Sequence, residues 1–391
     1  MSDPLWVVPG ERTFPRLQGQ TEADVAVVGG GFSGLGAAWA AMQSGASVVV
    51  LEARTIAAGA SGRNAGFILS GPAMGFGASV AAIGLEETLE IWRLTEENHS
   101  LLLSLLEELS TDCGYLRRGS LSLAASDTEW DVMQEECGRM LNAGLNVCLM
   151  PSSSLPRPFD SLYQGGVYHP GNAELDPGAF LRGMARHLAT RVTIFEESPV
   201  EVIENGEQLL LLSLEGTVTA RRVVVATNAY TDTLLRAVPI APTRGQVAST
   251  RPLSRVIAPF PMYADRGFQY WRQTADGRLV VGGWRNLDLE AEVGRDELLH
   301  ERIQAALRHF VEQVAPGAGI ERRWAGIMGF TPDHYPLVGP VPGHAGIFMA
   351  AGYSGHGVAM AFICGARAAR ESLGEGAIIP GAFRPERLIP V

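Results

Sequence analysis

The most informative absence in this sequence is that of lysine. Its 391 residues include 31 basic residues, and every one of them is arginine. Schiff-base chemistry requires a lysine, so pyridoxal-phosphate enzymes and lysine-dependent aldolases are excluded. P-loop NTPases of the GxxxxGK type and protein kinases are also excluded, because both place a lysine on phosphate groups. Genomic drift toward arginine is the simpler origin of this bias, and the exclusions hold in either case.

Positive charge and paired cysteines are also scarce. The 42 acidic residues outnumber the basic ones and give a net charge of −11, whereas a nucleic-acid partner requires a basic patch. The four cysteines (Cys113, Cys137, Cys148 and Cys364) are irregularly spaced without a CxxC pair, so we expect free thiols and no metal site. The length favours two domains, and the 46% hydrophobic content is typical of a globular protein.

No segment has the composition of a membrane span or a signal peptide. The most apolar late stretch, residues 345–366, is interrupted by Tyr353, Ser354 and His356, and a span requires about 20 apolar residues. The first residues have neither a basic region nor an apolar core. We therefore expect a cytoplasmic protein without an integral membrane segment.

Glycines form a GxGxxG motif at Gly29, Gly31 and Gly34. An apolar run typical of a buried parallel strand precedes the motif, and an alanine-rich helical segment follows it. Gly29 permits the tight turn, Gly31 the approach of a pyrophosphate, and Gly34 close helix–strand packing. The helix N-terminus, with Phe32 and Ser33, then faces the phosphates. The pattern predicts a dinucleotide site.

The residues after the next strand favour FAD over NAD. Glu52 ends that strand and is positioned to accept ribose hydroxyls, and its charge disfavours the 2′-phosphate of NADP. A second loop of small residues, GASGRNAGF at 59–67, follows Ala53 and Arg54. An NAD domain has no need of such a loop, whereas a flavin ring must lie against backbone.

The glycine motif and the small-residue loop are the first two of six motifs along the chain. In order, the six are GGGFSGLG, GASGRNAGF, DPGAF, VVVATNAY, PLVGP and GYSGHG. Over residues 24–373 the series resembles the D-amino-acid oxidase-like family of FAD-dependent oxidoreductases, near its glycine oxidase, sarcosine oxidase and γ-glutamylputrescine oxidase types. The resemblance implies an α/β plus α+β fold: a Rossmann-like, glutathione-reductase-type FAD-binding domain with an inserted substrate domain built on an antiparallel sheet. We assign residues 1–84, 166–235 and 323–391 to the FAD-binding domain, and residues 85–165 and 236–322 to the substrate domain.

The resemblance and the glycine motif together predict the cofactor-binding residues. In the flavin loop, Arg63 has a surface ion pair as its alternative role. For His356, before the last helix, a satisfied core histidine is an equal alternative. The predicted set is Gly29, Gly31, Phe32, Ser33, Gly34, Glu52, Ala53, Arg54, Ser61, Arg63, Asn64, Ala65, Gly66, Val200, Thr227, Asn228, Gly352, Gly355, His356 and Gly357.

The reaction implied by the resemblance is oxidation of a C–N bond, with hydride transfer to flavin N5 and hydrolysis of the iminium to a carbonyl. The catalytic candidates are Arg63, His356, Tyr270 and Arg272. Relatives that bind flavin covalently use a Cys before PLVGP or a His in the GASG loop. This chain has no Cys between residues 149 and 363 and carries Arg63 in the loop, so we expect noncovalent FAD.

Two carboxylate anchors of the family are missing. Met328 stands where glycine oxidase-like members have Arg, and Ala359 where sarcosine oxidase-like members have Lys. A buried carboxylate needs a charged partner. We therefore expect a polyamine-like or secondary amine in preference to a small α-amino acid, unless Arg244, Arg272 or Arg285 supplies the anchor. Each of the three is more simply explained as a surface residue.

The electron acceptor is open at this stage. Some family members activate O2 with a lysine beside the flavin, which this chain lacks. The alternative is a flavin dehydrogenase that passes electrons to a quinone or a partner protein. An alternative from another class is a flavin-binding subunit or an RNA-modification domain, which the charge and the missing basic patch disfavour.

Overall fold

Buried apolar strands build the first of two large sheets. The computed structural model describes residues 4–7, 12–109 and 111–390. In this sheet β1 (Gly19–Val28) lies between two parallel neighbours, β11 (Gly216–Val225) and β2 (Val48–Leu51). The strand order is β17-β18-β11-β1-β2-β8, with the hairpin β9-β10 attached to β11. The remaining strands are β8 (Thr193–Phe195), β9 (Val200–Glu204), β10 (Leu209–Ser213), β17 (Leu337–Pro340) and β18 (Ile347–Ala351).

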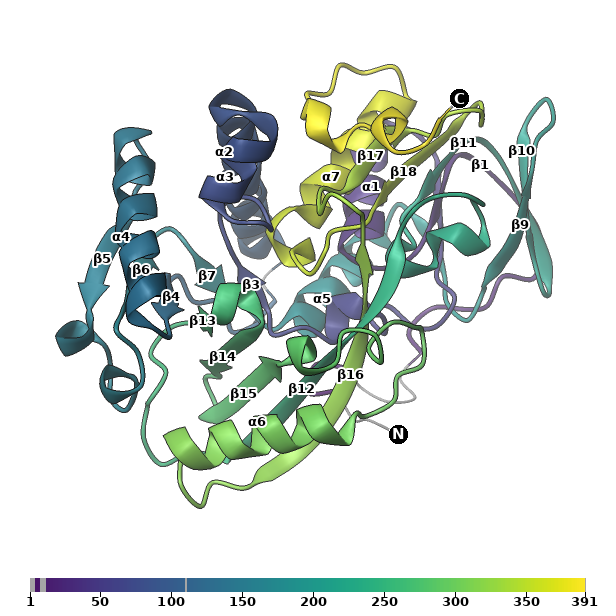
Figure 1. Ribbon diagram of the computed structural model, residues 1–391. Helices are drawn as coiled ribbons and strands as arrows, with labels where there is room; N and C mark the ends of the chain where they lie inside the picture. The colour runs from purple at the N-terminus through teal and green to yellow at the C-terminus, as the bar shows by residue number, and fades with distance from the viewer. Residues whose placement is uncertain (1–3, 8–11, 110, 391) are drawn as a thin grey trace.

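The second sheet is antiparallel except where β13 pairs with β4. Its order is β16-β12-β15-β14-β13-β4-β6-β5, and it lies below and to the left of the first sheet in Figure 1. Its strands are β4 (Ser120–Ala124), β5 (Cys148–Pro151), β6 (Gly165–His169), β12 (Ala241–Pro252), β13 (Met262–Ala264), β14 (Gln269–Gln273), β15 (Arg278–Gly283) and β16 (Ile320–Phe330). A small pair, β3 (Phe67–Ile68) and β7 (Ala173–Glu174), lies apart from both.

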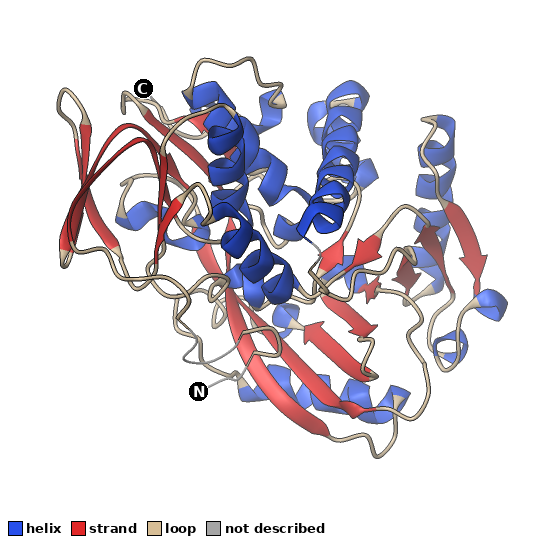
Figure 2. Cartoon of the chain, turned by 180° about the vertical axis from the view of Figure 1, so that it is seen from behind, coloured by secondary structure: helices blue, strands red, loops and turns tan. Residues whose placement is uncertain are grey.

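The helices cover the two sheets, as the view from behind in Figure 2 also shows. Asp176 caps α5 by accepting a hydrogen bond from the Ala179 N–H at 2.8 Å, with Pro177 at the first position, as the sequence predicts. The helices are α1 (Phe32–Gln43), α2 (Phe76–Ile83), α3 (Leu85–Leu109), α4 (Asp127–Asn142), α5 (Pro177–Leu188), α6 (Glu301–Val314) and α7 (Gly357–Ser372).

Helices α1 and α7 cross in direct backbone contact. A Cβ on Gly36 would lie 2.1 Å from the Phe362 carbonyl oxygen, and one on Gly365 would lie 1.9 Å from the Ser33 carbonyl oxygen. Only glycine allows this approach. The crossing lies at the first turn of α1 and the middle of α7, and the hydroxyl of Tyr353, from the loop before α7, lies 2.7 Å from the Ser33 hydroxyl.

The two faces of the second sheet have different partners. On one face, Trp271 and Val281 pack with Leu307 and Phe310 of α6, which lies beneath the sheet in Figure 1. On the other, Val280 and neighbouring residues pack with Trp6 and the small-residue loop of the nucleotide domain. A site enclosed by the two domains therefore lies on the face of the sheet away from α6.

The predicted fold class is confirmed by the structure and its relatives, but three predicted domain boundaries need correction. The boundary at 165/166 cuts β6, and the one at 322/323 cuts β16, although both strands belong to the second sheet. The boundary at 84/85 assigns α3 to the substrate domain, whereas Ile91 and Leu102 of α3 pack in the core shared with α1, α5 and α7. The hydrophobic periodicity of the sequence locates β6, β16 and α3 but does not reveal which elements they pack against.

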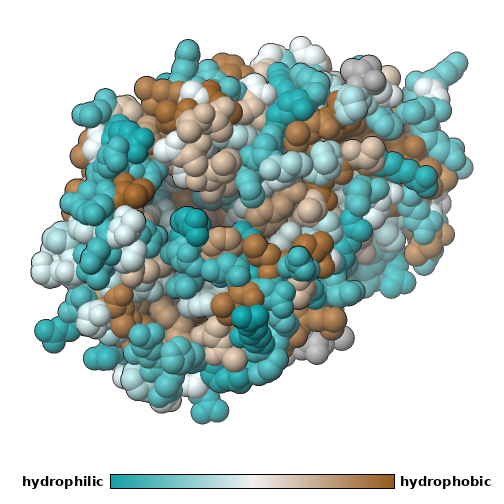
Figure 3. Space-filling view, viewed as in Figure 1, coloured by the Kyte–Doolittle hydropathy of each residue, from teal (hydrophilic) through white to brown (hydrophobic). Residues whose placement is uncertain are grey.

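The surface and the cysteines agree with the composition. All four cysteines are unpaired. No helix in the described part of the chain is long and apolar enough to cross a membrane. The face in Figure 3 carries many hydrophilic side chains with hydrophobic ones scattered among them.

Candidate active site

The glycine motif forms a tight turn between β1 and α1. Gly29 has φ +114°, and a Cβ on Gly34 would lie 1.8 Å from the Gly29 carbonyl oxygen. Helix α1 begins after Gly31 without a side-chain cap, which leaves N–H groups of its first turn for an external acceptor. The Ser61 hydroxyl lies at this end and accepts a hydrogen bond from the Phe32 N–H at 3.2 Å. These features fit a dinucleotide pyrophosphate.

Glu52 is held beside this turn by backbone donors. Its Oε2 accepts from the Gly30 N–H at 2.7 Å and its Oε1 from the Arg54 N–H at 2.8 Å. Burial raises the pKa of the Glu52 carboxyl. The Ser198 N–H donates to the Glu52 carbonyl at 2.9 Å, so the chain leading to Val200 of β9 runs along the same edge. The acid and Val200 thus lie on the side where a ribose and adenine would follow the pyrophosphate.

The small-residue loop is shaped by Asn64 and clamped to the second sheet. The Asn64 Nδ2 donates to the Ala60 and Ser61 carbonyls at 2.9 and 2.8 Å, and its Oδ1 accepts from the Gly66 N–H at 2.7 Å. The Trp324 indole donates to the Arg63 carbonyl at 2.9 Å. The Asn64 side chain is therefore used within the protein, and the loop presents its backbone to a flat ligand.

Arg63 is fixed by three acceptors. Its Nε and Nη1 donate to the Ala58 and Ala325 carbonyls at 2.8 and 3.0 Å. Its Nη2 lies 2.8 Å from Glu297 Oε2, while Arg54 Nη1 lies 2.8 Å from Oε1 of the same carboxylate. Glu297 belongs to the segment that leads into α6, so one acid of the substrate domain compensates two predicted cofactor-binding arginines.

The loop before α7 lies beside the nucleotide turn. Asn228 has φ +47°, and its Oδ1 accepts from the Gly352 N–H at 2.9 Å, while the Thr227 hydroxyl contacts Thr231. His356 is the residue immediately before α7, which begins without a side-chain cap. The His356 Nε2 is buried without a partner, and burial lowers the pKa of the ring to about 4. His356 is therefore neutral at neutral pH, with an unsatisfied nitrogen available to a bound molecule.

The opposite wall comes from the second sheet. The Tyr270 ring covers Gly282, where a Cβ would lie 2.4 Å from it, and stands edge-on to Phe67 with centroids 6.1 Å apart. Burial raises the pKa of the Tyr270 phenol to about 12, so it remains protonated. Met328 reaches the loop before α7, since a Cβ on Gly355 would lie 3.5 Å from its sulfur.

Two of the three candidate arginine anchors are structural. Arg244 is buried, lies 3.6 Å from Glu292, and donates to the Asp296 and Ala291 carbonyls at 2.9 and 2.8 Å. Arg272 is also buried. It donates to the Leu175 carbonyl at 2.9 Å, pairs with Glu174 at 3.8 Å and lies over the Trp6 ring. The expectation of surface positions was wrong for both.

These contacts also correct the assignment of Arg272 as catalytic. Arg272 shares the face of β14 that carries Tyr270, but its guanidinium donates to the Leu175 carbonyl and lies over the Trp6 ring, and these contacts favour a structural role. The other three catalytic candidates come from different elements: Arg63 from the small-residue loop, Tyr270 from β14, and His356 from the position directly before α7. Their roles stay predictions.

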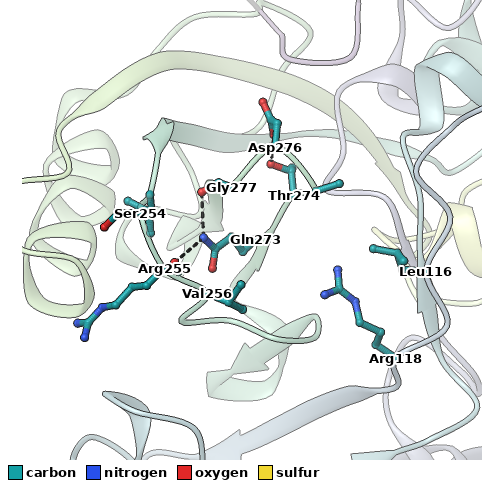
Figure 4. Close-up of a pocket in the computed structure, with 11 residues that line it drawn as sticks. Leu116, Arg118, Ser254, Arg255, Val256, Gln273, Thr274, Asp276 and Gly277 are labelled. Carbon is teal, nitrogen blue, oxygen red and sulfur yellow. Dashed lines mark hydrogen bonds between the residues drawn. The ribbon is translucent and has the colours of Figure 1, made fainter.

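A separate surface pocket of about 360 Å³ lies at the turn between β14 and β15. Figure 4 shows Gln273 donating to the carbonyls of Arg255 and Gly277 at 3.0 and 2.9 Å across its floor. Arg118 points into the opening from the other side. None of the predicted site residues lines it, so we do not connect this pocket with the cofactor.

The uncapped helix, the acid at the end of β2 and the second sheet opposite them define a nucleotide-dependent oxidoreductase site. Comparison with known proteins narrows the class. The sequence model of the FAD dependent oxidoreductase family (DAO) matches residues 24–371. The chain therefore belongs to this family and uses FAD.

Relatives match along almost the whole chain. The probable oxidoreductase OrdL of Haemophilus influenzae is 29% identical, over 93% of this chain and 85% of the relative. Gamma-glutamylputrescine oxidoreductase of Escherichia coli is 27% identical, over 90% and 84%. The structure of glycine oxidase from Geobacillus kaustophilus superposes with a TM-score of 0.81 at 21% identity, covering 95% of this chain and 99% of that one.

Glu297 is a residue of the site without a signal in the sequence. In the sequence, Glu297 looks like one of many surface acids, although the structure pairs it with Arg54 and Arg63. Its position depends on contacts between segments hundreds of residues apart, such as its pairing with Arg54. The sequence does not show which residues pair across such distances, so it does not single out Glu297 as a residue of the site.

Proposed function

We propose that this protein oxidises the C–N bond of a polyamine-like or secondary amine in preference to a small α-amino acid. The coarser statement, an FAD-dependent oxidoreductase of the DAO family acting on amines or amino acids, follows from the family. The observation that supports the narrower proposal is Met328. It stands beside Gly355 at the position where glycine oxidase-like members have an arginine, and it offers no charge to an α-carboxylate.

The residues around the site suit this chemistry. When bound, FAD accepts a hydride from the carbon next to nitrogen, and water then converts the resulting C=N bond to a carbonyl and a free amine. Tyr270, Phe67 and Met328 provide an apolar wall that favours the neutral amine over its ammonium form. Because His356 is neutral, it is available to accept or donate a hydrogen bond through Nε2 without adding charge.

The proposal is tested by the products. Incubation of the holoenzyme with secondary amines and γ-glutamyl amines should yield one carbonyl and one amine per amine consumed, measured by mass spectrometry. Sarcosine and glycine should give little product. Faster turnover of glycine or sarcosine than of any larger amine would refute the preference.

A dehydrogenase that uses a quinone or partner protein is the second candidate, and three observations favour it. The chain has no lysine, His356 is neutral, and the Arg63 charge is compensated by Glu297 at 2.8 Å. Neither a lysine nor His356 therefore supplies positive charge to assist reduction of O2, and Glu297 offsets part of the charge of Arg63 and Arg54. Peroxide release at the rate of amine oxidation would identify an oxidase, and turnover only with an added quinone a dehydrogenase.

Glu297→Gln should raise the reduction potential of the bound flavin. The substitution removes the negative charge that compensates Arg63 and Arg54, so the negative charge gained on reduction is better stabilised. We expect a rise on the order of 30 mV, equivalent to about 1.4 kcal/mol for two electrons, measured by spectroelectrochemical titration. Glu301→Gln, an exposed acid paired with Arg308, is the control and should change nothing. An unchanged potential in Glu297→Gln would show that Arg63 does not act on the flavin.

We further propose that FAD is held without a covalent bond. The GASG loop carries Arg63, whose guanidinium is already engaged, and the described chain between residues 149 and 363 contains no Cys. Acid precipitation of the yellow protein should therefore leave the flavin in the supernatant, measured by its absorbance. A yellow pellet would show covalent attachment.

A further inference from the structure

The Arg285 guanidinium lies in an aromatic clamp, formed by Phe268 and Phe330. Its Cζ is 4.4 Å from the Phe268 ring centroid and 4.7 Å from the Phe330 centroid. Phe268 comes just before β14, and Phe330 ends β16. Aromatic rings stabilise a guanidinium through its flat faces. The clamp thus fixes the plane of the Arg285 guanidinium. The N–H groups lie in that plane, at the edge of the guanidinium, and remain able to donate to an acceptor other than the two rings.

No acid among the described residues neutralises Arg285. Burial lowers the pKa of its guanidinium, opposed only by the nearby Tyr270 phenol. Other arginines of the same sheet have carboxylate partners: Arg244 has Glu292, and Arg272 has Glu174. None of the fully buried polar atoms without a hydrogen-bond partner in the described chain belongs to Arg285. The Arg285 donors therefore face open space, with no hydrogen bond from the described protein.

The clamp borders the substrate side of the site. A Cβ on Gly355 would lie 3.9 Å from Phe330 Cζ and 3.5 Å from the Met328 sulfur. Tyr270, on the strand that follows Phe268, lies near Arg285. The Phe330 ring thus has Arg285 stacked on it and also reaches the loop before α7, beside the Met328 sulfur.

We propose that Arg285 binds a carboxylate of the substrate, so that the substrate is an amine that also carries a carboxylate group. The inference rests on the proposed function and deepens it. A planar guanidinium forms two parallel hydrogen bonds with a carboxylate, and this geometry requires a fixed plane. The carboxylate supplies the counter-charge that the protein does not, at a place in the fold other than those of Met328 and Ala359.

The test measures binding of simple carboxylates and does not depend on turnover. Acetate, butyrate and benzoate, each paired with its amide, are titrated into the FAD-loaded enzyme by calorimetry. At least one carboxylate should bind to the wild type, and Arg285→Gln should weaken it roughly 10- to 100-fold. The amides should be unaffected by the substitution. Arg322→Gln, which removes an exposed arginine of β16, should leave carboxylate binding unchanged.

A conservative variant guards against misfolding. Arg285→Lys keeps the charge but loses the planar fork, and should weaken the carboxylate several-fold with FAD content and Tm as in the wild type. Unchanged binding in both variants, equal weakening of acid and amide, or no carboxylate binding to the wild type would overturn the inference. Arg285-dependent binding without reduction of the flavin by any amine would refute the proposed function alone.

Discussion

Gly31→Leu should yield a folded but nearly colourless protein. A Cβ at this position would lie 2.6 Å from the Ser61 hydroxyl, a clash that rotation of one small side chain relieves. The rest of the leucine then occupies the space before the uncapped start of α1, where the pyrophosphate must approach backbone. We expect the flavin content, measured as the ratio of absorbance near 450 nm to that at 280 nm, to fall at least about tenfold.

The matched control is Gly138→Ala in α4, where a Cβ would have no neighbour within 4 Å. It should retain full colour and gain about 0.5–1 kcal/mol of stability, because alanine loses less backbone entropy than glycine in a helix. Circular dichroism of Gly31→Leu should match the wild type. A yellow Gly31→Leu protein would remove the basis for placing the pyrophosphate at this turn.

Glu174→Ala should be among the most destabilising substitutions in the chain. Glu174 is buried and lies 2.8 Å from Arg118 and 3.8 Å from Arg272, which is itself buried. Removing the acid takes away the carboxylate that stabilises the buried Arg272 charge most, because Asp176 contributes less. Such losses cost about 3–5 kcal/mol of unfolding free energy, measured by urea denaturation of the holoenzyme.

A double variant separates buried charge from lost packing. Replacing Arg272 by Met together with Glu174→Ala removes the uncompensated charge and should recover part of the loss. Glu135→Ala, which breaks an exposed pair with Arg139, should cost less than about 0.5 kcal/mol. If the double variant is no more stable than the single one, the buried charge of Arg272 is not the source of the effect.

Elements with strong local signals are predicted well from this sequence. The predicted GxGxxG turn agrees with the structure. The Asp-Pro start of α5 and the helical apolar stripe of α3 (Leu85–Leu109) are likewise local features that the sequence displays. These features depend on glycine conformation, capping and helical periodicity, which lie within a few residues of one another.

Features that depend on distant partners were missed or misassigned. Arg244 and Arg272 were expected at the surface because arginine seldom lies in a core, but each has a carboxylate partner supplied by another segment. Arg285 belonged to the same group of candidates and differs from them only in having no such partner. Only the structure reveals this difference. It distinguishes the structural arginines Arg244 and Arg272 from Arg285, which we propose binds the substrate.

The missing lysine acquires a clearer meaning from these contacts. Every basic residue of the chain is an arginine. The two arginines nearest the predicted flavin loop, Arg54 and Arg63, pair with Glu297. Arg285 has no carboxylate partner among the described residues and is stacked between two aromatic rings. The positive charge of this site is therefore better suited to holding a substrate than to assisting O2.

Anaerobic flavin reduction is the most direct test of the central claim, which is oxidation of an amine by this FAD-dependent protein. The yellow holoenzyme is mixed without oxygen with secondary amines, γ-glutamyl amines, glycine and sarcosine, and the band near 450 nm is followed. We predict rapid bleaching by at least one larger amine that carries a carboxylate, and slow or no bleaching by glycine and sarcosine. Full retention of the band with every amine would contradict the account.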